Sequence, residues 1–334
     1  MSTLALELSD AGLLALPSEG EISAPSPGFA VINDDSIIVG RPAAARCRLT
    51  PRRVNTRFWL DVSTDELGPP HGRNLRTADL VWTHLHELWG EIFRGVTSVI
   101  LTLAGGRREE QLGLILGIAR SAGLPVDGMV DAAVAGAVGQ VDNRSALHLD
   151  LELHRAVLSV LEPGPSRCAV FTSDRVGLAA INDAWLSFAA SAFLKITRFD
   201  PFHSAASEQV LFDLLPAKLT ELRRRNSVKL SQTSGEQVFS IELDRARVVA
   251  AVEHHWAEID ALVKAALDHR PDRLLLTARA AVLPGLADRL GALTGLEVAE
   301  LPLAAAPAGA LRFADRIRSP DRALPLVTSL ATGG

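Results

Sequence analysis

The 334-residue sequence contains few of the residues that build disulfide-linked or metal-linked proteins. It has two cysteines, Cys47 and Cys168, which lie far apart in the chain and lack the spacing of metal ligands. Isolated cysteines of this kind are typical of a reduced cytoplasmic protein and not of a disulfide-stabilised secreted one. Tyrosine is absent altogether, which we ascribe to compositional bias and not to function.

Long apolar runs and a basic N-terminal segment are also missing. No stretch reaches the roughly 18 uninterrupted apolar residues of a membrane-spanning helix. The N-terminus carries Glu7 and Asp10 in place of the positive charges that open a signal peptide. The formal net charge is -5, with acids and bases interspersed, which argues against a general nucleic-acid surface. We therefore expect a cytoplasmic protein with no direct membrane insertion and no nucleic-acid partner.

The remaining composition is that of a globular protein large enough for two domains. Hydrophobic residues make up 48% and charged residues 22% of the chain. Strand-like and helix-like patterns alternate, which favours an α/β fold. Hairpins are predicted over 3–16, 28–39, 146–160 and 227–243, a buried strand over 96–103, and helices over 77–93, 109–122, 129–138, 182–198, 207–225 and 245–269.

Several segments follow one another in a characteristic order. A hairpin leads into residues 38–43 (I-V-G-R-P-A), and Pro51 follows. A strand, turn and helix then run from 101 to 124 and end in A-G-L, ahead of an alanine-rich segment that begins at Asp131. Segments 274–284 and 303–310 complete the series near the C-terminus.

In order and spacing these segments resemble the nucleotide-binding domain of the DnaK-type seventy-kilodalton heat-shock chaperones, within the actin/hexokinase-like ATPase superfamily. The resemblance spans about residues 3–315. It implies an α/β fold of the two-lobed actin-like ATPase (ribonuclease H-like) type, DnaK subtype. The first lobe is expected at 1–165, the second at 166–320 and a C-terminal tail at 321–334. The chaperones' substrate-binding domain is expected to be lacking.

The same resemblance assigns the first phosphate loop, which in the family reads acid-x-Gly-Thr-Thr. In one register Glu7 takes the place of the acid, Ser9 that of the glycine, and Asp10 the position where a hydroxyl should meet phosphate. A shifted register makes Asp10 the acid and Gly12 the glycine, which leaves two leucines in the phosphate positions. Both registers replace groups that a triphosphate needs.

The second phosphate loop reads Asp-x-Gly-Gly-Gly-Thr in the family and D-L-E-L-H-R here, from Asp150 to Arg155. The metal-side aspartate is kept, but Glu152 and His154 stand at glycine positions. Glu152 would repel a triphosphate unless Mg²⁺ or Arg155 compensated its charge. The paired glycines of the adenosine loop are replaced by Ala278 and Arg279, whose side chains would crowd a purine.

Candidate roles follow from these matches. With ATP or ADP and Mg²⁺ as the cofactor, the resemblance implies a catalytic set, a set contacting the nucleotide, and a pair holding the metal through water. The catalytic set is Asp150, Asp131 and Arg57, the nucleotide set is Glu7, Ser9, Asp10, Gly12, Glu152, His154, Ala278 and Arg279, and the metal pair is Asp10 and Asp150.

Because the phosphate loops depart from the family pattern, we expect a degenerate relative: a cytoplasmic scaffold or regulator that binds an unknown protein partner. The alternative is an active Mg-ATP-dependent, chaperone-like switch, with in-line attack of water on the γ-phosphate. A sugar or acetate kinase is disfavoured because no substrate-loop signature occurs. No Ser-His-Asp or Cys-His constellation can be named from spacing alone.

Overall fold

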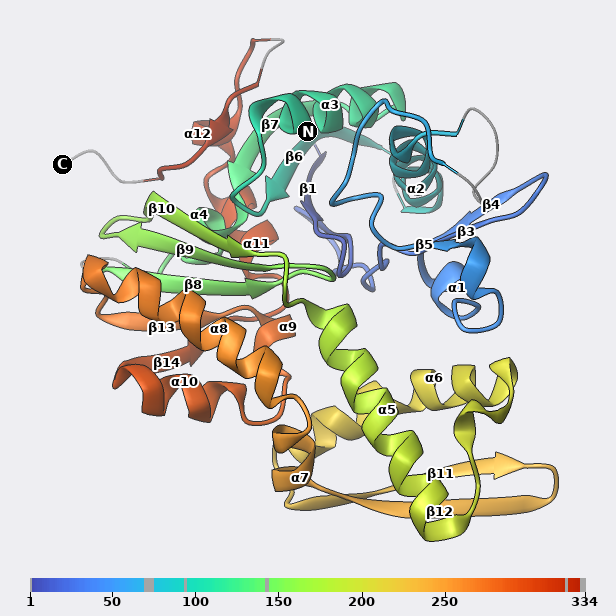
Figure 1. Cartoon of the computed structure of the whole chain (residues 1–334). Helices are drawn as coiled ribbons and strands as arrows, with labels where there is room; N and C mark the ends of the chain where they lie inside the picture. The colour runs from blue at the N-terminus through green and yellow to red at the C-terminus, as the bar shows by residue number, and fades with distance from the viewer. Residues whose placement is uncertain (1, 69–74, 93–94, 142–143, 322–323, 331–334) are drawn as a thin grey trace.

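The computed structural model describes residues 2–68, 75–92, 95–141, 144–321 and 324–330. These residues form an α/β fold around two mixed β-sheets (Figure 1), each with five strands in the part of the chain that is described. No helix among these residues has both the length and the apolar character needed to cross a membrane.

The first sheet has the strand order β15-β7-β6-β1-β2. Strands β1 and β2 form an antiparallel hairpin. Strand β1 also pairs in parallel with β6, which pairs in parallel with β7. Its strands are β1 (Ser2–Leu8), β2 (Leu14–Pro17), β6 (Val96–Leu103), β7 (Val126–Asp131) and β15 (Leu326–Val327).

The second sheet has the order β10-β9-β8-β13-β14 and is built in the same way. Here β8 and β9 form the hairpin, and β8 pairs in parallel with β13, which pairs in parallel with β14. Its strands are β8 (Ala146–Leu151), β9 (Ala156–Glu162), β10 (Ser166–Ser173), β13 (Arg273–Leu276) and β14 (Glu297–Glu300).

Helices cover the two outer faces and fill the layer between the sheets. The first sheet carries α2 (Thr77–Ile92) and α3 (Glu109–Ser121) outside, and the second carries α8 (Glu253–Ala266) and α10 (Leu286–Thr294). Between the sheets, α4 (Ala132–Gly136) packs against α11 (Ala305–Arg312). Small residues allow this close crossing: a Cβ at Gly309 would collide with the carbonyl oxygen of Ala135.

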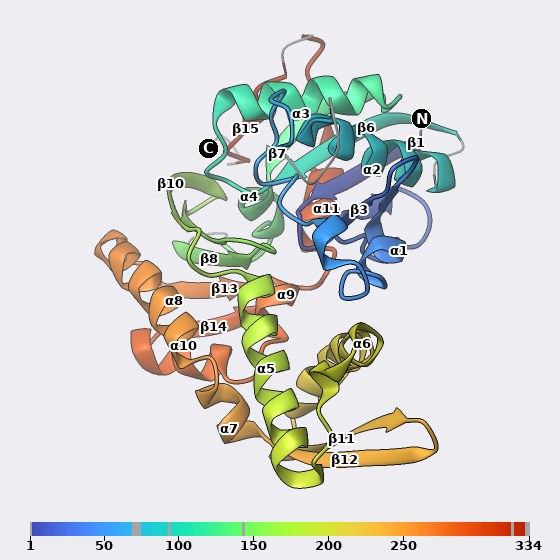
Figure 2. The same cartoon turned by 45° about the vertical axis from the view of Figure 1, so that its right-hand side comes forward.

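Two smaller units flank the sheets. One consists of the three-stranded sheet β3 (Ala30–Ile32), β4 (Ile37–Val39) and β5 (Val54–Asn55) with α1 (Gly40–Ala44) and η1 (Pro51–Arg53). The other projects away from both sheets (Figure 2). It contains α5 (Leu178–Thr197), η2 (Pro201–His203), α6 (Ala205–Leu222), the hairpin β11 (Ser227–Ser234) and β12 (Gln237–Asp244), and α7 (Arg245–Ala250).

The remaining short elements connect these parts: η3 (Leu267–His269), α9 (Ala278–Ala281) and α12 (Ala314–Ile317). The four predicted hairpins and the strand at 96–103 are all present. The alanine-rich segment after Asp131 forms α4, and the Asp131 carboxylate caps it by accepting hydrogen bonds from the N–H groups of Ala133 and Val134.

Two predicted helices are wrong in part. Residues 129–131 belong to β7, because pairing with β6 overrides their local helical tendency. The helix predicted over 245–269 is broken between α7 and α8. At the break, Trp185 and Trp256 donate their indole N–H groups to the carbonyls of Val248 and Val249 at 2.8 and 3.1 Å, respectively. These carbonyls end α7 and are satisfied by side chains from the core.

At both predicted lobe boundaries, strands on either side of the boundary belong to the same sheet. Position 165 lies between β9 and β10, which are antiparallel neighbours in the second sheet. The predicted tail contains β15, which pairs with Met129 and Val130 of β7 and so adds a strand to the first sheet. The lobe ranges 1–165 and 166–320 and the tail 321–334 therefore remain predictions.

Candidate functional site at two facing hairpin turns

Strand alternation places two carboxylates in the layer between the sheets. On β1, Leu6 and Leu8 face the outer core, whereas Ala5 faces the middle layer, and Glu7 shares the face of Ala5. On β8, Leu149 and Leu151 lie in the outer core of the second half, and Asp150 points to the opposite side. Glu7 and Asp150 are 5% and 2% exposed, so both carboxylates are buried where the two hairpins face each other.

Arg279 lies between these carboxylates. It comes from α9, which begins directly after β13, the strand beside β8. Its Nη2 donates to Oε1 of Glu7 at 2.6 Å and to Oδ2 of Asp150 at 2.7 Å, and its Nε donates to Oδ1 of Asp150 at 2.6 Å. Thr277 adds a hydrogen bond to Oδ1 of Asp150 at 2.9 Å. One guanidinium therefore joins the first sheet to the second.

The two carboxylates differ in their electrostatics. Burial acts to raise the pKa of Asp150, but the charge and hydrogen bonds of Arg279 outweigh it and leave that pKa below its usual value. Burial raises the pKa of Glu7, and Arg279 only partly offsets this. A single guanidinium cannot neutralise two buried carboxylates, and Asp150 takes the larger share of its charge.

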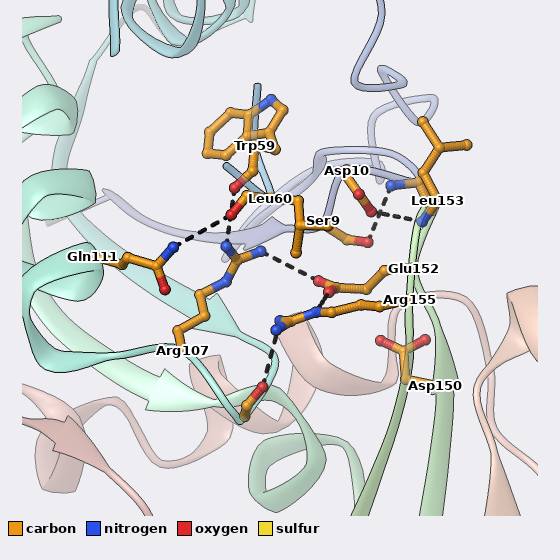
Figure 3. A network of polar contacts seen from close by, with 12 residues as sticks. Ser9, Asp10, Trp59, Leu60, Arg107, Gln111, Asp150, Glu152, Leu153 and Arg155 are labelled. Atoms are coloured by element: carbon orange, nitrogen blue, oxygen red, sulfur yellow. Dashed lines mark hydrogen bonds and ion pairs between the residues drawn. The ribbon is translucent and has the colours of Figure 1, made fainter. Parts of the chain in front are cut away.

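The two hairpin turns are in direct contact. The first is a turn over Ser9–Gly12, in which the Gly12 N–H donates to the Ser9 carbonyl at 3.0 Å. Oδ1 of Asp10 accepts a hydrogen bond from the N–H of Leu153, in the second turn, at 2.6 Å (Figure 3). Oδ2 of Asp10 is buried and has no hydrogen-bond partner among the described residues. Burial, with the charge of Glu152 nearby, raises the pKa of Asp10 to about 7.

Beside this contact, two arginines converge on Glu152. Arg107 follows β6 and donates from Nη2 to Oε1 of Glu152 at 3.3 Å, and Arg155 donates from Nε to Oε2 (Figure 3). Each arginine also donates to a main-chain carbonyl, Arg107 to Trp59 at 3.0 Å and Arg155 to Gly105 at 3.4 Å. The side chains of Glu152, Arg107 and Arg155 are 0%, 2% and 6% exposed. The negative charge of Glu152 is therefore paired with two buried arginines and does not face solvent.

The other predicted site residues have local partners. Asp131 caps α4 and accepts a hydrogen bond from Arg167 Nη1 at 2.6 Å. Nε2 of His154 lies 2.9 Å from both oxygens of Thr56, and Arg57 pairs with Asp61 at the surface.

Gly12 packs against Pro25, and Ala278 is the first residue of α9, directly before Arg279. The structure thus brings Glu7, Asp10, Asp150, Glu152 and Arg279 to the two turns, with Ser9 in the first of them. It leaves Asp131 and Arg57 in separate ion pairs.

Sequence reasoning missed Arg107. Its one visible signal is its place in G-G-R-R, directly after the buried strand β6, where the ends of parallel strands meet. Its partner lies 45 residues further along the chain, so only the packing of the two hairpins reveals the pair.

Two cavities border the turns. One of about 20 Å³ touches Glu7, Asp150 and Arg279 and has room for about one water molecule. The other, of about 430 Å³, is lined by Ala11 and by Leu153 and His154 of the two turns, and by the two flanking units.

Mg²⁺ with a nucleotide does not fit the residues at these turns. Of the predicted metal pair, Asp150 is bound by Arg279, which also binds Glu7, and Asp10 accepts the Leu153 N–H. The carboxylate of Glu152 lies in the turn that should donate N–H groups to phosphate. Among the described residues no group of three or more His, Cys, Asp or Glu side chains could hold a metal ion.

A serine–histidine contact elsewhere has the wrong tautomer for nucleophilic catalysis. Nε2 of His84 lies 2.8 Å from Oγ of Ser26, but Nδ1 accepts the indole N–H of Trp59 at 3.1 Å. The ring proton must then be on Nε2, which donates to Ser26 and cannot take its proton. Burial also lowers the pKa of His84 to about 3, so the ring stays neutral.

Comparisons with known proteins add no relative. No protein-family model matches the chain, and no curated protein is significantly similar to it in sequence. The geometry of the two turns is therefore the basis for the functional proposal.

Proposed function

We propose that this chain is a divergent relative of the DnaK-type nucleotide-binding domain that acts in the cytoplasm as a scaffold or regulator and binds a protein partner. In this proposal the two lobes of an actin-like ATPase fold are kept, and the phosphate-binding turns are closed by the chain's own side chains. The observation that carries it is Arg279, which occupies the space between Glu7 and Asp150.

The two sheets support the fold part of the proposal. In each, a hairpin strand pairs in parallel with a later strand, and that strand pairs in parallel with the next. The hairpin turns of the two sheets then meet, through Asp10 and Leu153. A duplicated unit with two facing turns is the arrangement expected of the actin-like ATPases.

The charges at the turns favour a scaffold over an ATPase. Catalysis of phosphoryl transfer needs carboxylates free to hold Mg²⁺ and N–H groups free to hold phosphate. Here Asp150 and Glu7 share one arginine, and Glu152 is held by two. Displacing Arg279 would leave two buried carboxylates without a positive partner, which is costly.

The unit built from α5, α6 and the β11–β12 hairpin supports the binding of a protein partner. It carries six of the ten large apolar side chains that are exposed among the described residues, between 37% and 66% accessible to solvent, and a partner that covered them would remove their apolar surface from water. These are Leu194, Ile196, Phe202, Val210, Leu214 and Val238. We place the partner on this unit.

Isothermal titration with Mg-ATP and with Mg-ADP tests the proposal. The wild-type protein is expected to release no heat of binding at millimolar nucleotide. Asp150→Ala, which removes the metal-side carboxylate, serves as the control. Micromolar binding by the wild type that disappears in Asp150→Ala would overturn the scaffold and establish the Mg-ATP-binding switch instead.

A further inference from the structure

The hairpin of β11 and β12 is a sheet of two strands, and neither strand has another strand beside it among the described residues. The strands pair along their whole length. The hairpin projects from the rest of the molecule, and α5 and α6 pack against it (Figures 1 and 2). Each strand therefore has a free edge, at which main-chain N–H and C=O groups can pair with a further strand.

The turn of the hairpin decides which residues point to these edges. Its two-residue loop begins at Gly235, whose φ is 59°, as a type II′ turn requires at its first central position. Such a turn closes a hydrogen-bonded pair, here Ser234 and Gln237, and hydrogen-bonded and non-hydrogen-bonded pairs alternate from there. Ser231 and Ser240 are therefore a non-hydrogen-bonded pair, which agrees with the 2.9 Å between their Oγ atoms. The main-chain groups of both serines point outward, to opposite edges of the hairpin.

The two free edges differ in charge. Lysine on an edge strand hinders the addition of a further strand, and Lys229 points outward on the β11 edge. On the β12 edge, by contrast, residues 237–241 (Q-V-F-S-I) carry no charge. Val238 points outward there and is 66% exposed, the largest value among the large apolar side chains described. An uncharged run of strand-forming residues at a free edge favours pairing with another strand.

We propose that two copies of this chain associate through the free edge of β12 and form a continuous four-stranded antiparallel sheet. A two-fold axis perpendicular to the sheet brings the same edge of each copy together, so the assembly closes as a dimer. The axis also places both α5 helices on one face of the joined sheet. Each helix ends beside β12, where Phe199 stacks on Phe239 with ring centroids 4.5 Å apart, and exposes Leu194 and Ile196.

The charges on β12 are compatible with this self-pairing. Bonds across the joined edges are made by the residues whose main chain points outward, which are Val238, Ser240, Glu242 and Asp244. With the axis at Ile241, Glu242 faces Ser240 of the second copy, and Asp244 faces Val238. Each acid then lies opposite an uncharged residue, and like charges, which destabilise cross-strand pairs, are not opposed.

Sedimentation velocity of the full chain at rising protein concentration tests the inference. The wild type is expected to shift reversibly from monomer to dimer. Ser240→Pro should remain a monomer, because proline removes the outward N–H from the β12 edge and keeps the ladder to β11. The matched control is Ser231→Pro, the same change in the residue directly opposite, which should dimerise like the wild type. Both variants lose the contact between the two hydroxyl groups, so damage to the hairpin alone would affect them equally.

A second pair of variants changes the same edge without changing the main chain. Val238→Glu sets a carboxylate against Asp244 of the second copy and should weaken the dimer about tenfold or more, whereas Val238→Lys should not weaken it. A wild type that stays monomeric up to its solubility limit would overturn the inference, as would a dimer that survives Ser240→Pro. If circular dichroism shows both proline variants to be misfolded, the Val238 variants decide, and equal dimerisation by these two contradicts the inference.

The association itself does not depend on the proposed function. A monomeric wild type would leave the nucleotide titration unchanged, and nucleotide binding would leave the sedimentation result unchanged. One consequence does rest on the proposed function: the dimer gives the scaffold two partner-binding units, so a partner with two matching sites binds it more tightly than a monomer.

Discussion

Replacing Asp10 with asparagine should change how the stability of this protein depends on pH. In the folded protein the pKa of Asp10 is raised from 3.8 to about 7, first by burial and then by the charge of Glu152. Arg107 and Arg155 also face Asp10 and act in the opposite direction, as does the Leu153 N–H. An asparagine keeps the shape of the side chain and the acceptor for Leu153, but it does not titrate.

The sign and the size of this pH dependence follow from the linkage between proton binding and folding. Between about pH 4 and 7 the unfolded chain has lost the Asp10 proton and the folded chain still holds it, so the free energy of unfolding falls as pH rises. A pKa raised from 3.8 to about 7 corresponds to about 4 kcal/mol of stability. The stabilisation is fully present below about pH 4 and is lost as pH rises through about 7.

Urea unfolding followed by circular dichroism measures this difference across the pH range. Asp10→Asn and wild type should have similar stability near pH 4, and the variant should gain up to about 4 kcal/mol over the wild type by about pH 8. Asp34→Asn, at an exposed position in the turn between β3 and β4, is the matched control and should follow the wild type. A constant difference at all pH values, or an Asp10→Asn protein that is less stable at high pH, would refute the reasoning.

Three further changes test other parts of the structure. Arg279→Met should cost about 3–5 kcal/mol in urea unfolding near neutral pH, because it leaves two buried carboxylates unpaired; Asp150→Asn added to it should recover part of the loss. Gly177→Ala should cost about 1–3 kcal/mol by the same assay, because the new Cβ would lie 2.6 Å from main-chain atoms of the second hairpin turn. Thiol titration should modify exposed Cys168 first and Cys47 slowly, because Cys47 is buried and burial raises its pKa to about 11.

The hairpins and most helices could be predicted from the sequence because their signals are local. S-D-A-G between two apolar runs predicts the first turn, and the structure has a turn at Ser9–Gly12. Alternation along β1 and β8 decides which face Glu7 and Asp150 take. The break in the helix at Val252 was missed because Trp185, which binds the Val248 carbonyl at the end of α7, comes from a segment 63 residues away.

The candidate site was predicted in part. The resemblance brought Glu7, Asp150 and Arg279 to one place, but it assigned Arg279 to the purine position and not to an ion pair with both carboxylates. Spacing along the chain carries no information on such a pair, because Arg279 and Glu7 are 272 residues apart. Arg107 was missed for the same reason.

The central claim is that Arg279 lies where a Mg-nucleotide would place its metal and phosphates. A crystal structure of the wild-type protein grown with millimolar Mg-ATP tests it directly. The account predicts the Arg279 guanidinium between Glu7 and Asp150, and Glu152 between Arg107 and Arg155, with no nucleotide at the two turns. Mg²⁺ and phosphate between Glu7 and Asp150, with Arg279 displaced, would contradict it.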